Sequence, residues 1–256
     1  MLKCSHILCK VNRIADAVRD FQKLGFNVTW GSDPARAHNA LLWFERGPFV
    51  ELFQIPRAAA YLRHPLGWFY GQAAGSRWHS WSEADKGWCD VALEPVRNAL
   101  PERSGAEANR QELQRVREEA ERLGIAASRI MNGKRVRPDG QIVKYSLFVP
   151  KPAGLPFVVS HYDPPQRPDR IAHPNGASGI AWVRYGVPEA GASHLRKLAP
   201  GDEWLIAETS ANSGVIEVGV HGLRERLDPA LAHGALMVPA GRPASRIPSL
   251  KEENER

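Results

Sequence analysis

Cysteine is scarce in this 256-residue sequence, which contains only Cys4, Cys9 and Cys89. So small and odd a number does not make a disulfide framework, and it is typical of a protein from a reducing compartment. No run of residues approaches the ~18 consecutive apolar side chains that a membrane-spanning helix needs. The N-terminal stretch MLKCSHILCKVNRIAD carries charges where a signal peptide would have an apolar segment. We therefore expect a cytoplasmic protein with no membrane partner.

Several common active-site motifs are missing as well. The sequence contains no phosphate-binding P-loop, no Gly-x-Gly-x-x-Gly after a predicted strand, no Gly-x-Ser-x-Gly and no Cys-x-x-Cys. Their absence argues against the commonest nucleotide-binding, hydrolase and zinc-ribbon proteins. The net charge is +6, but the basic residues are scattered, and the most charged predicted helix, residues 107–122, mixes both signs. We therefore expect no nucleic-acid partner, and the charge favours an anionic substrate or solubility.

The first part of the sequence has the rhythm of a β-α-β-β-β module. Apolar residues recur at helical spacing from Ile14 to Leu24, and Gly25 follows as a C-cap. Short apolar or alternating runs on both sides of this helix predict strands that end at turn residues. We expect these strands at residues 5–11, 26–30, 40–44 and 49–53.

The same order returns in the second part of the sequence. A helix is expected where Leu113, Val116, Ala120 and Leu123 share one face, and it ends at Gly124. The last strand of each module carries the same Pro-Phe-Val, starting at Pro48 and at Pro156. An internal repeat of this length is stronger evidence than any single motif. We expect the strands of the second module at residues 88–93, 128–134, 142–149 and 155–161.

These patterns divide the chain into five segments. The segment between the modules is rich in Trp, His and Gly, and we expect a helix and a loop that form either a pocket wall or a small satellite core. A Pro-rich loop after the second module leads to a third unit, with strands at 179–187, 204–208 and 214–220 and a helix at 189–198. The tail is Pro-, Arg- and Glu-rich, and we expect disorder at its end. The boundaries are residues 1–56 for the first module, 57–86 for the connector, 87–165 for the second module, 166–238 for the loop and the βαββ segment, and 239–256 for the tail.

Five short pieces of the sequence, in this order and spacing, resemble the glyoxalase-like branch of the vicinal oxygen chelate superfamily. The resemblance covers most of residues 1–190. The pieces are His6 in the first strand, Leu24-Gly25-Phe26, His38-Asn39-Ala40-Leu41, Val50-Glu51-Leu52 and His173-Pro174-Asn175-Gly176-Ala177.

This resemblance implies an α+β fold in which tandem βαβββ modules form a curved mixed sheet around one cavity, the glyoxalase/bleomycin-resistance/dioxygenase fold. It also implies that residues on the first and fourth strands of each module hold a divalent metal, which chelates vicinal oxygens of the substrate. Members of the superfamily include lyases, isomerases, extradiol dioxygenases, epoxide-opening resistance enzymes and metal-free drug-binding proteins. The fold therefore does not determine the reaction.

His6 and Glu51 are the first candidates for metal ligands. Imidazole nitrogen and carboxylate oxygen suit Zn²⁺, Fe²⁺, Mn²⁺ or Ni²⁺, and adjacent strands can direct both side chains into one cavity. The alternative is a hydrogen-bonded core histidine and a pocket-lining or surface carboxylate. In the second module, Val159 aligns with Glu51 and the match to His6 falls near Trp88, so neither position supplies a ligand. His161 lies two residues after Val159 on the same strand face and is a candidate third ligand.

The remaining candidate residues lie in loops and at strand ends. Glu51 and His173 are candidate acid–base groups, since His173 can line the pocket from the Pro-rich loop, although a structural turn capped by His173 is the alternative. Other candidates for substrate binding come from the same short pieces and from the first strand of the second module. They are His38, Asn39, Trp88 and Asn175.

Two functions compete on this basis. The first is a metal-dependent enzyme of the lyase, isomerase or dioxygenase type, acting on a small oxygenated or anionic metabolite with the metal as Lewis acid. The second is a metal-free protein of the drug-sequestering kind, which would hold a planar ligand against Trp43, Trp88 and Trp182. A structural or homodimer-forming subunit is a third alternative, because exposed β-edges also serve assembly.

Overall fold

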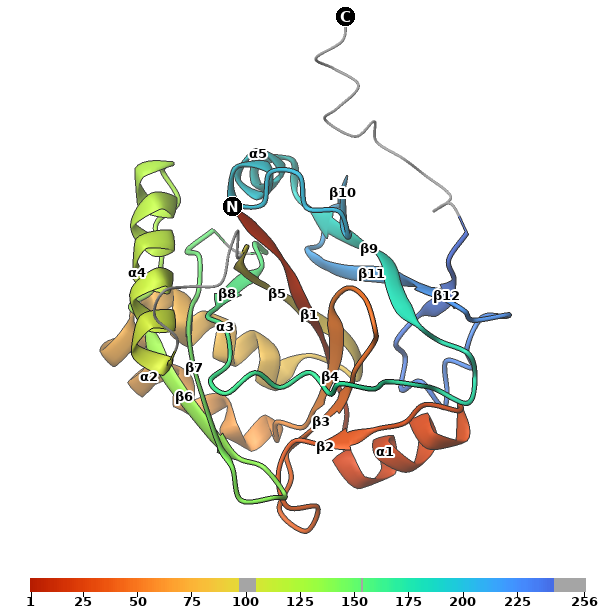
Figure 1. Cartoon of the computed structure of the whole chain (residues 1–256). Coiled ribbons are helices and arrows are strands. Elements are labelled where there is room, and N and C mark those ends of the chain that lie inside the picture. Colours follow the sequence, from red (N-terminus) through yellow and green to blue (C-terminus); the bar gives the residue numbers. More distant parts are fainter. Residues whose placement is uncertain (97–104, 153, 242–256) are drawn as a thin grey trace, which may run out of the picture.

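The computed structural model describes residues 1–96, 105–152 and 154–241, and its N-terminal part is one complete βαβββ module (Figure 1). Helix α1 forms because Ile14, Ala17, Val18 and Phe21 make one apolar face, and all four side chains are buried. The elements of this module are β1 (Leu2–Lys10), α1 (Ile14–Lys23), β2 (Thr29–Trp30), β3 (Asn39–Leu42) and β4 (Phe49–Phe53).

The second module repeats this order of elements and confirms the predicted tandem fold. Its helix buries Leu113 and Ala120 and leaves a highly charged face outside. The elements are β5 (Gly87–Pro95), α4 (Ala106–Arg122), β6 (Met131–Val136), β7 (Ile142–Phe148) and β8 (Phe157–Val159).

The two modules share one eight-stranded sheet with the order β2-β3-β4-β1-β5-β8-β7-β6. Strands β1 and β5 pair antiparallel at the centre, β1 pairs parallel with β4, and β5 pairs parallel with β8. Each half of the sheet therefore repeats the other about the β1–β5 junction, and the sheet ends in β2 on one side and β6 on the other.

The connector is more helical than the sequence predicts. It consists of the 3-10 helix η1 (Arg57–Leu62) and the helices α2 (Arg63–Tyr70) and α3 (Gln72–Glu83). Lys10 explains where α3 ends: its buried ammonium donates to the carbonyls of Ser82 and Ala84 at 2.6 and 2.7 Å. A cation on the last carbonyls of a helix satisfies groups that the helix itself leaves unpaired.

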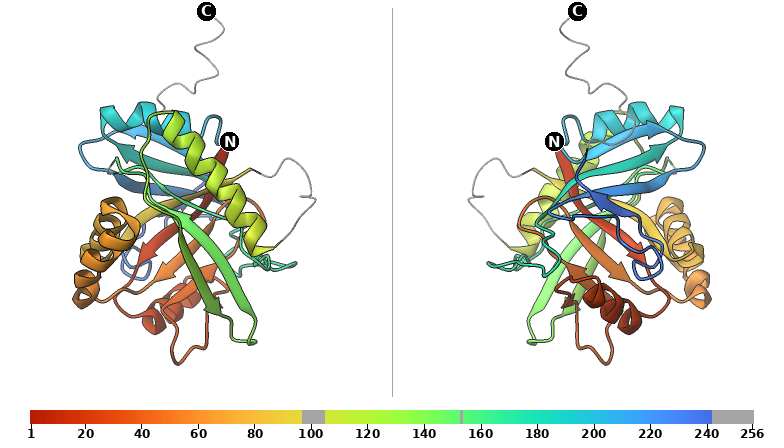
Figure 2. Two further views of the ribbon diagram at one scale, coloured as in Figure 1. Left: turned by 90° about the vertical axis from the view of Figure 1, so that its left-hand side faces the viewer. Right: turned by 90° about the vertical axis from the view of Figure 1, so that its right-hand side faces the viewer.

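The third unit adds a separate four-stranded sheet with the order β10-β9-β11-β12. Its βαββ part confirms the predicted extra segment, and β12 is an addition that the sequence pattern did not indicate. The elements are β9 (Gly179–Val187), α5 (Glu189–Leu198), β10 (Leu205–Thr209), β11 (Gly214–His221) and β12 (Met237–Pro239). Both views of Figure 2 place α5 at one end of the molecule and α1 at the other.

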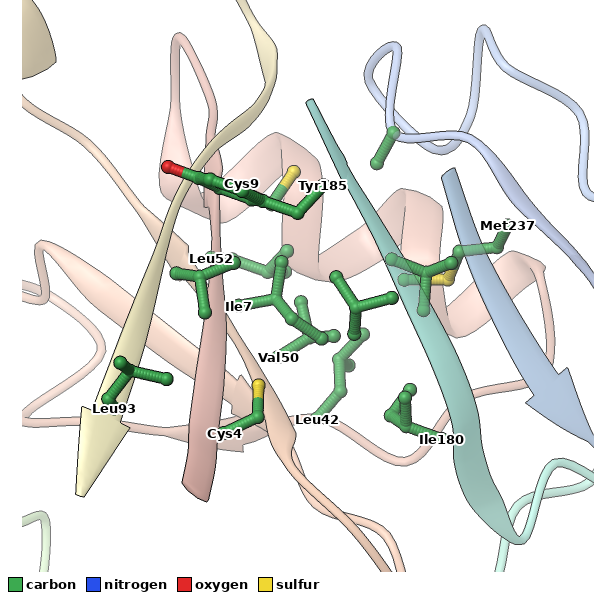
Figure 3. Packing of buried hydrophobic residues seen from close by; sticks show 14 of the residues in the cluster. Cys4, Ile7, Cys9, Leu42, Val50, Leu52, Leu93, Ile180, Tyr185 and Met237 are labelled. Carbon is green, nitrogen blue, oxygen red and sulfur yellow. The ribbon is translucent and has the colours of Figure 1, made fainter. Parts of the chain in front are cut away.

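The eight-stranded sheet has two faces with different roles. We call the face that packs on α1, α4 and the second sheet the core face; it carries Ile7, Cys9 and Leu93. Figure 3 shows this core between β1 and β5 on one side and β9 on the other. We call the opposite face, which carries Leu8, Ala92 and the candidate site, the site face. No helix in the described ranges has the length and apolar character that crossing a bilayer requires.

Candidate functional site

His6 and Glu51 lie side by side on the site face. His6 Nε2 is 3.6 Å from Glu51 Oε2, and the two side chains are 2% and 19% exposed. They come from adjacent parallel strands, where β1 pairs His6 with Phe49 and Leu8 with Glu51. The expected convergence of the first- and fourth-strand residues is therefore present in the structure.

An irregularity in β1 positions His6. The register between β1 and β5 shifts between Cys4 and His6. Because of this bulge, Ser5 also reaches the site face, where its hydroxyl donates to Glu94 Oε2 at 2.8 Å. His6 Nδ1 lies 3.3 Å from the same hydroxyl oxygen.

Burial makes His6 a neutral imidazole. Burial, with a smaller contribution from the nearby Arg135 guanidinium, lowers the pKa of His6 to about 3. The ring stacks on Phe49 with centroids 4.6 Å apart and an angle of 19° between the planes. At neutral pH the contact with Glu51 is therefore not an ion pair but an imidazole next to a carboxyl group.

Opposing effects act on the pKa of Glu51. Burial raises its pKa, whereas the Asn39 amide, which donates to Glu51 Oε1 at 2.8 Å, and the charge of Arg135 both lower it. The net direction is upward, so burial dominates. A carboxyl group with a raised pKa is better suited to exchange a proton near neutral pH than one in a salt bridge.

Aromatic rings surround the pair. Phe157 meets the His6 ring edge-on at 5.7 Å, and Tyr162 lies 6.4 Å from it. Tyr145 packs against Tyr162 at 5.4 Å. Burial raises the pKa of both phenols, and the neighbouring Glu51 raises them further, so both hydroxyls stay protonated as hydrogen-bond donors.

A long irregular segment closes the site from outside. We call residues 160–178, which join β8 to β9, the strap; it crosses β4 and β1 in Figure 1. Arg167 fastens it by donating to the carbonyls of Phe44 and Gly47, and its guanidinium lies 5.8 Å from the Trp43 ring centroid. Gln166 accepts a hydrogen bond from Arg135 at 3.1 Å. The strap therefore covers the aromatic side of the site.

The second module supplies no ligands at the positions equivalent to His6 and Glu51. Strand β5 pairs Ala92 with Phe157 as β1 pairs His6 with Phe49, so Ala92 matches His6 and Val159 matches Glu51. Trp88, the expected match to His6, lies opposite Cys9 instead. In the described part of the chain, no three His, Cys, Asp or Glu side chains are grouped so that they could hold a metal ion. His6 and Glu51 alone do not fit a resident divalent cation.

The His161 ring lies next to Glu94 and not at the contact between His6 and Glu51. Its Nδ1 is 3.9 Å from Glu94 Oε2, and its carbonyl accepts a hydrogen bond from Asn109. It follows β8 after the strand has ended, so the alternation that would aim it with Val159 does not apply. The expected triad of His6, Glu51 and His161 is not assembled.

Both ring nitrogens of His173 have backbone partners. Nδ1 accepts from the Asn27 amide at 3.0 Å, and Nε2 lies 2.8 Å from the Trp43 carbonyl oxygen. The ring is 8% exposed between Phe26 and Phe44. This geometry gives His173 the role of tying the strap to the first module, and it does not support the expected acid–base role.

Of the four residues expected to contact the substrate, only Asn39 lies at the site. Asn39 belongs to the site through Glu51, whereas His38 is exposed. Trp88 packs on the core face and donates to the Leu236 carbonyl, and Asn175 holds the end of α1 by donating to the Leu24 carbonyl. Trp43 lies against Phe49, but Trp182 binds the Gly241 carbonyl from the second sheet, so Trp43, Trp88 and Trp182 do not line one cavity.

Three site residues were not predicted: Arg135, Tyr145 and Tyr162. Tyr145 lies two residues before Leu147 on β7, and both side chains point to the site face. The alternation of side chains along a strand could therefore have placed Tyr145 there. Tyr162 and Arg135 reach the site from a loop and from the far edge strand, and no local pattern marks them.

Comparisons with known proteins agree with this architecture. The sequence model of the glyoxalase-like domain matches residues 4–199. No curated protein matches the sequence. Among solved structures, a hypothetical protein from Staphylococcus aureus is similar with a TM-score of 0.61 and 13% identity, over 93% of this chain and 98% of that one.

Two dioxygenases are more distant structural matches. An extradiol ring-cleaving dioxygenase from B. fuscum has a TM-score of 0.45 and 10% identity, over 86% of this chain and 57% of that one. Homoprotocatechuate 2,3-dioxygenase from Arthrobacter globiformis has a TM-score of 0.44 and 9% identity, over 86% and 63%. The match over residues 4–199 and the paired βαβββ modules together show that the chain belongs to the glyoxalase-like domain family.

Proposed function

We propose that the chain binds a small organic molecule on the site face and that Glu51 accepts a hydrogen bond or a proton from it. The observation that carries this proposal is the 3.6 Å approach of His6 Nε2 to Glu51 Oε2 within an aromatic enclosure. The pKa of Glu51 is raised, and because His6 is neutral the Glu51 carboxyl group forms no ion pair with it. It is therefore free to act on a bound molecule.

The surroundings supply the other requirements of a small-molecule site. Phe49, Phe157 and Tyr162 offer apolar surface for the body of a ligand. The protonated hydroxyls of Tyr145 and Tyr162 can donate hydrogen bonds to its oxygens. Asn39 fixes the orientation of the Glu51 carboxylate through Oε1 and leaves Oε2 on the side of His6.

A metal-dependent lyase, isomerase or dioxygenase is the second candidate, and one observation favours it. His6 and Glu51 are donors of suitable chemistry at 3.6 Å, on the strands that the family resemblance assigns to metal ligands. This candidate requires metal ligands in addition to His6 and Glu51, because Ala92 and Val159, the equivalent residues of the second module, cannot bind a metal. No step of the present proposal depends on a metal.

Binding of neutral hydroxyamides to chelator-treated protein tests the first candidate. Glycolamide, lactamide and mandelamide form a series of increasing size, and each offers Glu51 a hydroxyl donor. We expect saturation-transfer NMR to detect at least one of them with wild-type protein, and Glu51→Gln to weaken its binding about tenfold. Glu45→Gln, at an exposed position, is the matched control. Equal binding by wild type and Glu51→Gln contradicts the proposal.

Metal analysis of the purified protein discriminates the second candidate. One divalent ion per chain that survives dialysis and is lost in both His6→Ala and Glu51→Ala would favour metal-dependent chemistry. A content far below one per chain in wild type, with hydroxyamide binding intact, favours the metal-free site.

A further inference from the structure

Arg135 connects the two edges of the eight-stranded sheet at the candidate site. It lies on β6, the edge strand of the second module, and Gly31 directly follows β2, the edge strand of the first. Its Nη1 donates to the Gly31 carbonyl at 2.9 Å, and its Nη2 donates to Gln166 Oε1 of the strap at 3.1 Å. The guanidinium therefore sits where both modules and the strap meet.

The charge of Arg135 is not neutralised by any of these contacts. Both partners are uncharged oxygens, and within the described residues Arg135 forms no ion pair with a carboxylate. Gly31, whose carbonyl Arg135 contacts, also lies against the side chain of Asn39, which donates to Glu51. The guanidinium therefore lies beside the candidate site, and its charge lowers the pKa of Glu51 and of His6. A half-buried cation without a counter-ion is unfavourable, and the two contacts use only two of its five N–H donors.

We propose that Arg135 is the anion-binding residue of this site and that the ligand is a small carboxylate with a hydroxyl on the neighbouring carbon. This inference rests on the proposed function of the site and adds the class of ligand to it. The planar guanidinium matches a carboxylate through paired hydrogen bonds. The ligand needs the hydroxyl because Glu51 is a hydrogen-bond acceptor. Glu51 would repel an anionic ligand that offered it no hydrogen-bond donor.

The same balance of charges favours a carboxylate over a phosphate. Arg135 is the cation that acts on both His6 and Glu51, and Glu51 opposes a second negative charge on the ligand. A monoanion pairs with the guanidinium, whereas a dianion would leave one charge uncompensated next to Glu51. Inorganic phosphate is therefore a negative probe for this site.

Three matched pairs of probes test the inference: glycolate with glycolamide, lactate with lactamide, and mandelate with mandelamide. Within each pair only the charge changes, and the hydroxyl that addresses Glu51 is kept. We expect wild type to bind at least one carboxylate about tenfold more tightly than its amide and more tightly than phosphate. Arg135→Gln should remove this preference, so that the carboxylate and the amide of each pair bind with affinities within about twofold of each other.

Two control variants separate charge from structure. Arg137→Gln removes the same charge from a side chain that pairs with Asp139 in the β6–β7 turn, and it should keep the preference. Gln166→Ala removes the strap contact of Arg135 without changing the charge. If Gln166→Ala loses the carboxylate preference as fully as Arg135→Gln, the effect comes from the strap, and the inference is wrong.

The outcomes also distinguish this inference from the proposed function. If amides bind in a Glu51-dependent manner and the carboxylates bind no better, or phosphate binds as tightly, Arg135 is not a carboxylate site, although the proposed function stands. If neither amides nor carboxylates bind in a manner that depends on Glu51, both proposals fail.

Discussion

Ala92 lies opposite His6 at the junction of β1 and β5, so the two modules present a methyl group and an imidazole at equivalent positions. Val159 and Glu51 form the second such pair. The sheet is thus nearly symmetric in backbone, whereas the polar chemistry of the site face is concentrated in the first module. This asymmetry explains why only two of the four metal-ligand positions implied by the family resemblance carry donors.

Restoring the symmetry should create a metal site. We expect the double variant Ala92→His with Val159→Glu to retain about one Zn²⁺ or Ni²⁺ per chain after dialysis, because it would bring four donors together on the site face. Both positions are fully buried, so the added bulk should cost about 1–3 kcal/mol of stability. Ala92→Asn with Val159→Gln adds bulk with weaker ligands and serves as the control. A folded His/Glu variant with no more metal than this control would contradict the equivalence of the two modules.

The buried ion pair between Arg77 and Asp90 should be essential for attaching α3. Arg77 Nη1 lies 2.7 Å from Asp90 Oδ2, the Trp81 indole donates to the same oxygen, and the Asp90 side chain is 2% exposed. Asp90→Ala leaves the guanidinium buried without its partner, and we expect a loss of about 3–5 kcal/mol in the free energy of unfolding. Urea denaturation measures this loss.

The exposed pair between Arg57 and Asp85 is the matched control for that experiment. These side chains are 66% and 92% exposed at a separation of 3.0 Å. Asp85→Ala should change stability little, because solvent screens such pairs. Similar losses for Asp85→Ala and Asp90→Ala would show that burial does not determine the strength of the Arg77 contact.

The modular architecture could be predicted from sequence because each module has its own local pattern of apolar residues and the pattern occurs twice. Helix α1 and strand β4 follow directly from apolar spacing, and the shared Pro-Phe-Val marks the fourth strand of each module. The pairing of His6 with Ala92 rather than with Trp88 was not predictable in this way. Two register shifts in β1 and β5 alter the alignment, and a bulge leaves no clear sign in these residues.

The site itself was only half predictable for the same reason. Glu51 and Asn39 stand out because polar residues interrupt apolar strands, and they are indeed hydrogen-bonded to each other. Arg135 depends on the closure of the sheet, which brings β6 close to Gly31 over a long sequence separation. Such contacts follow from tertiary structure and not from the period of the local sequence.

His173 should act on stability rather than on chemistry. Burial lowers its pKa although the Trp43 hydrogen bond raises it, so the neutral ring can accept from Asn27 and donate to Trp43 at once. His173→Ala leaves two backbone groups without partners, and we expect a loss of about 2–4 kcal/mol in the free energy of unfolding. His173→Asn keeps a group near Nδ1 and should lose less. Equal stability of wild type and His173→Ala, measured by urea denaturation, would contradict this role.

The neutral state of His6 predicts how stability depends on pH. The pKa of His6 is about 3 in the folded chain, against an ordinary value of 6.5, so between these values the unfolded chain binds more protons. Stability from this group is therefore complete above about pH 7 and falls as the pH drops from 6.5 toward 3, by at most about 1.4 kcal/mol per pH unit. The pKa of Glu51 is raised in the folded chain, so its contribution to stability decreases as the pH rises.

The comparison is therefore made in a Glu51→Gln background, with and without His6→Asn. We expect the single variant to lose stability below pH 6.5 more steeply than the double variant, with parallel curves above pH 7. Urea denaturation at half-unit pH intervals measures both curves. Because every other titrating group is common to the two proteins, a constant difference between pH 7 and pH 4 would mean that His6 titrates normally. In that case its contact with Glu51 would be an ion pair at mildly acidic pH, and the carboxyl group would lose the freedom that its proposed role requires.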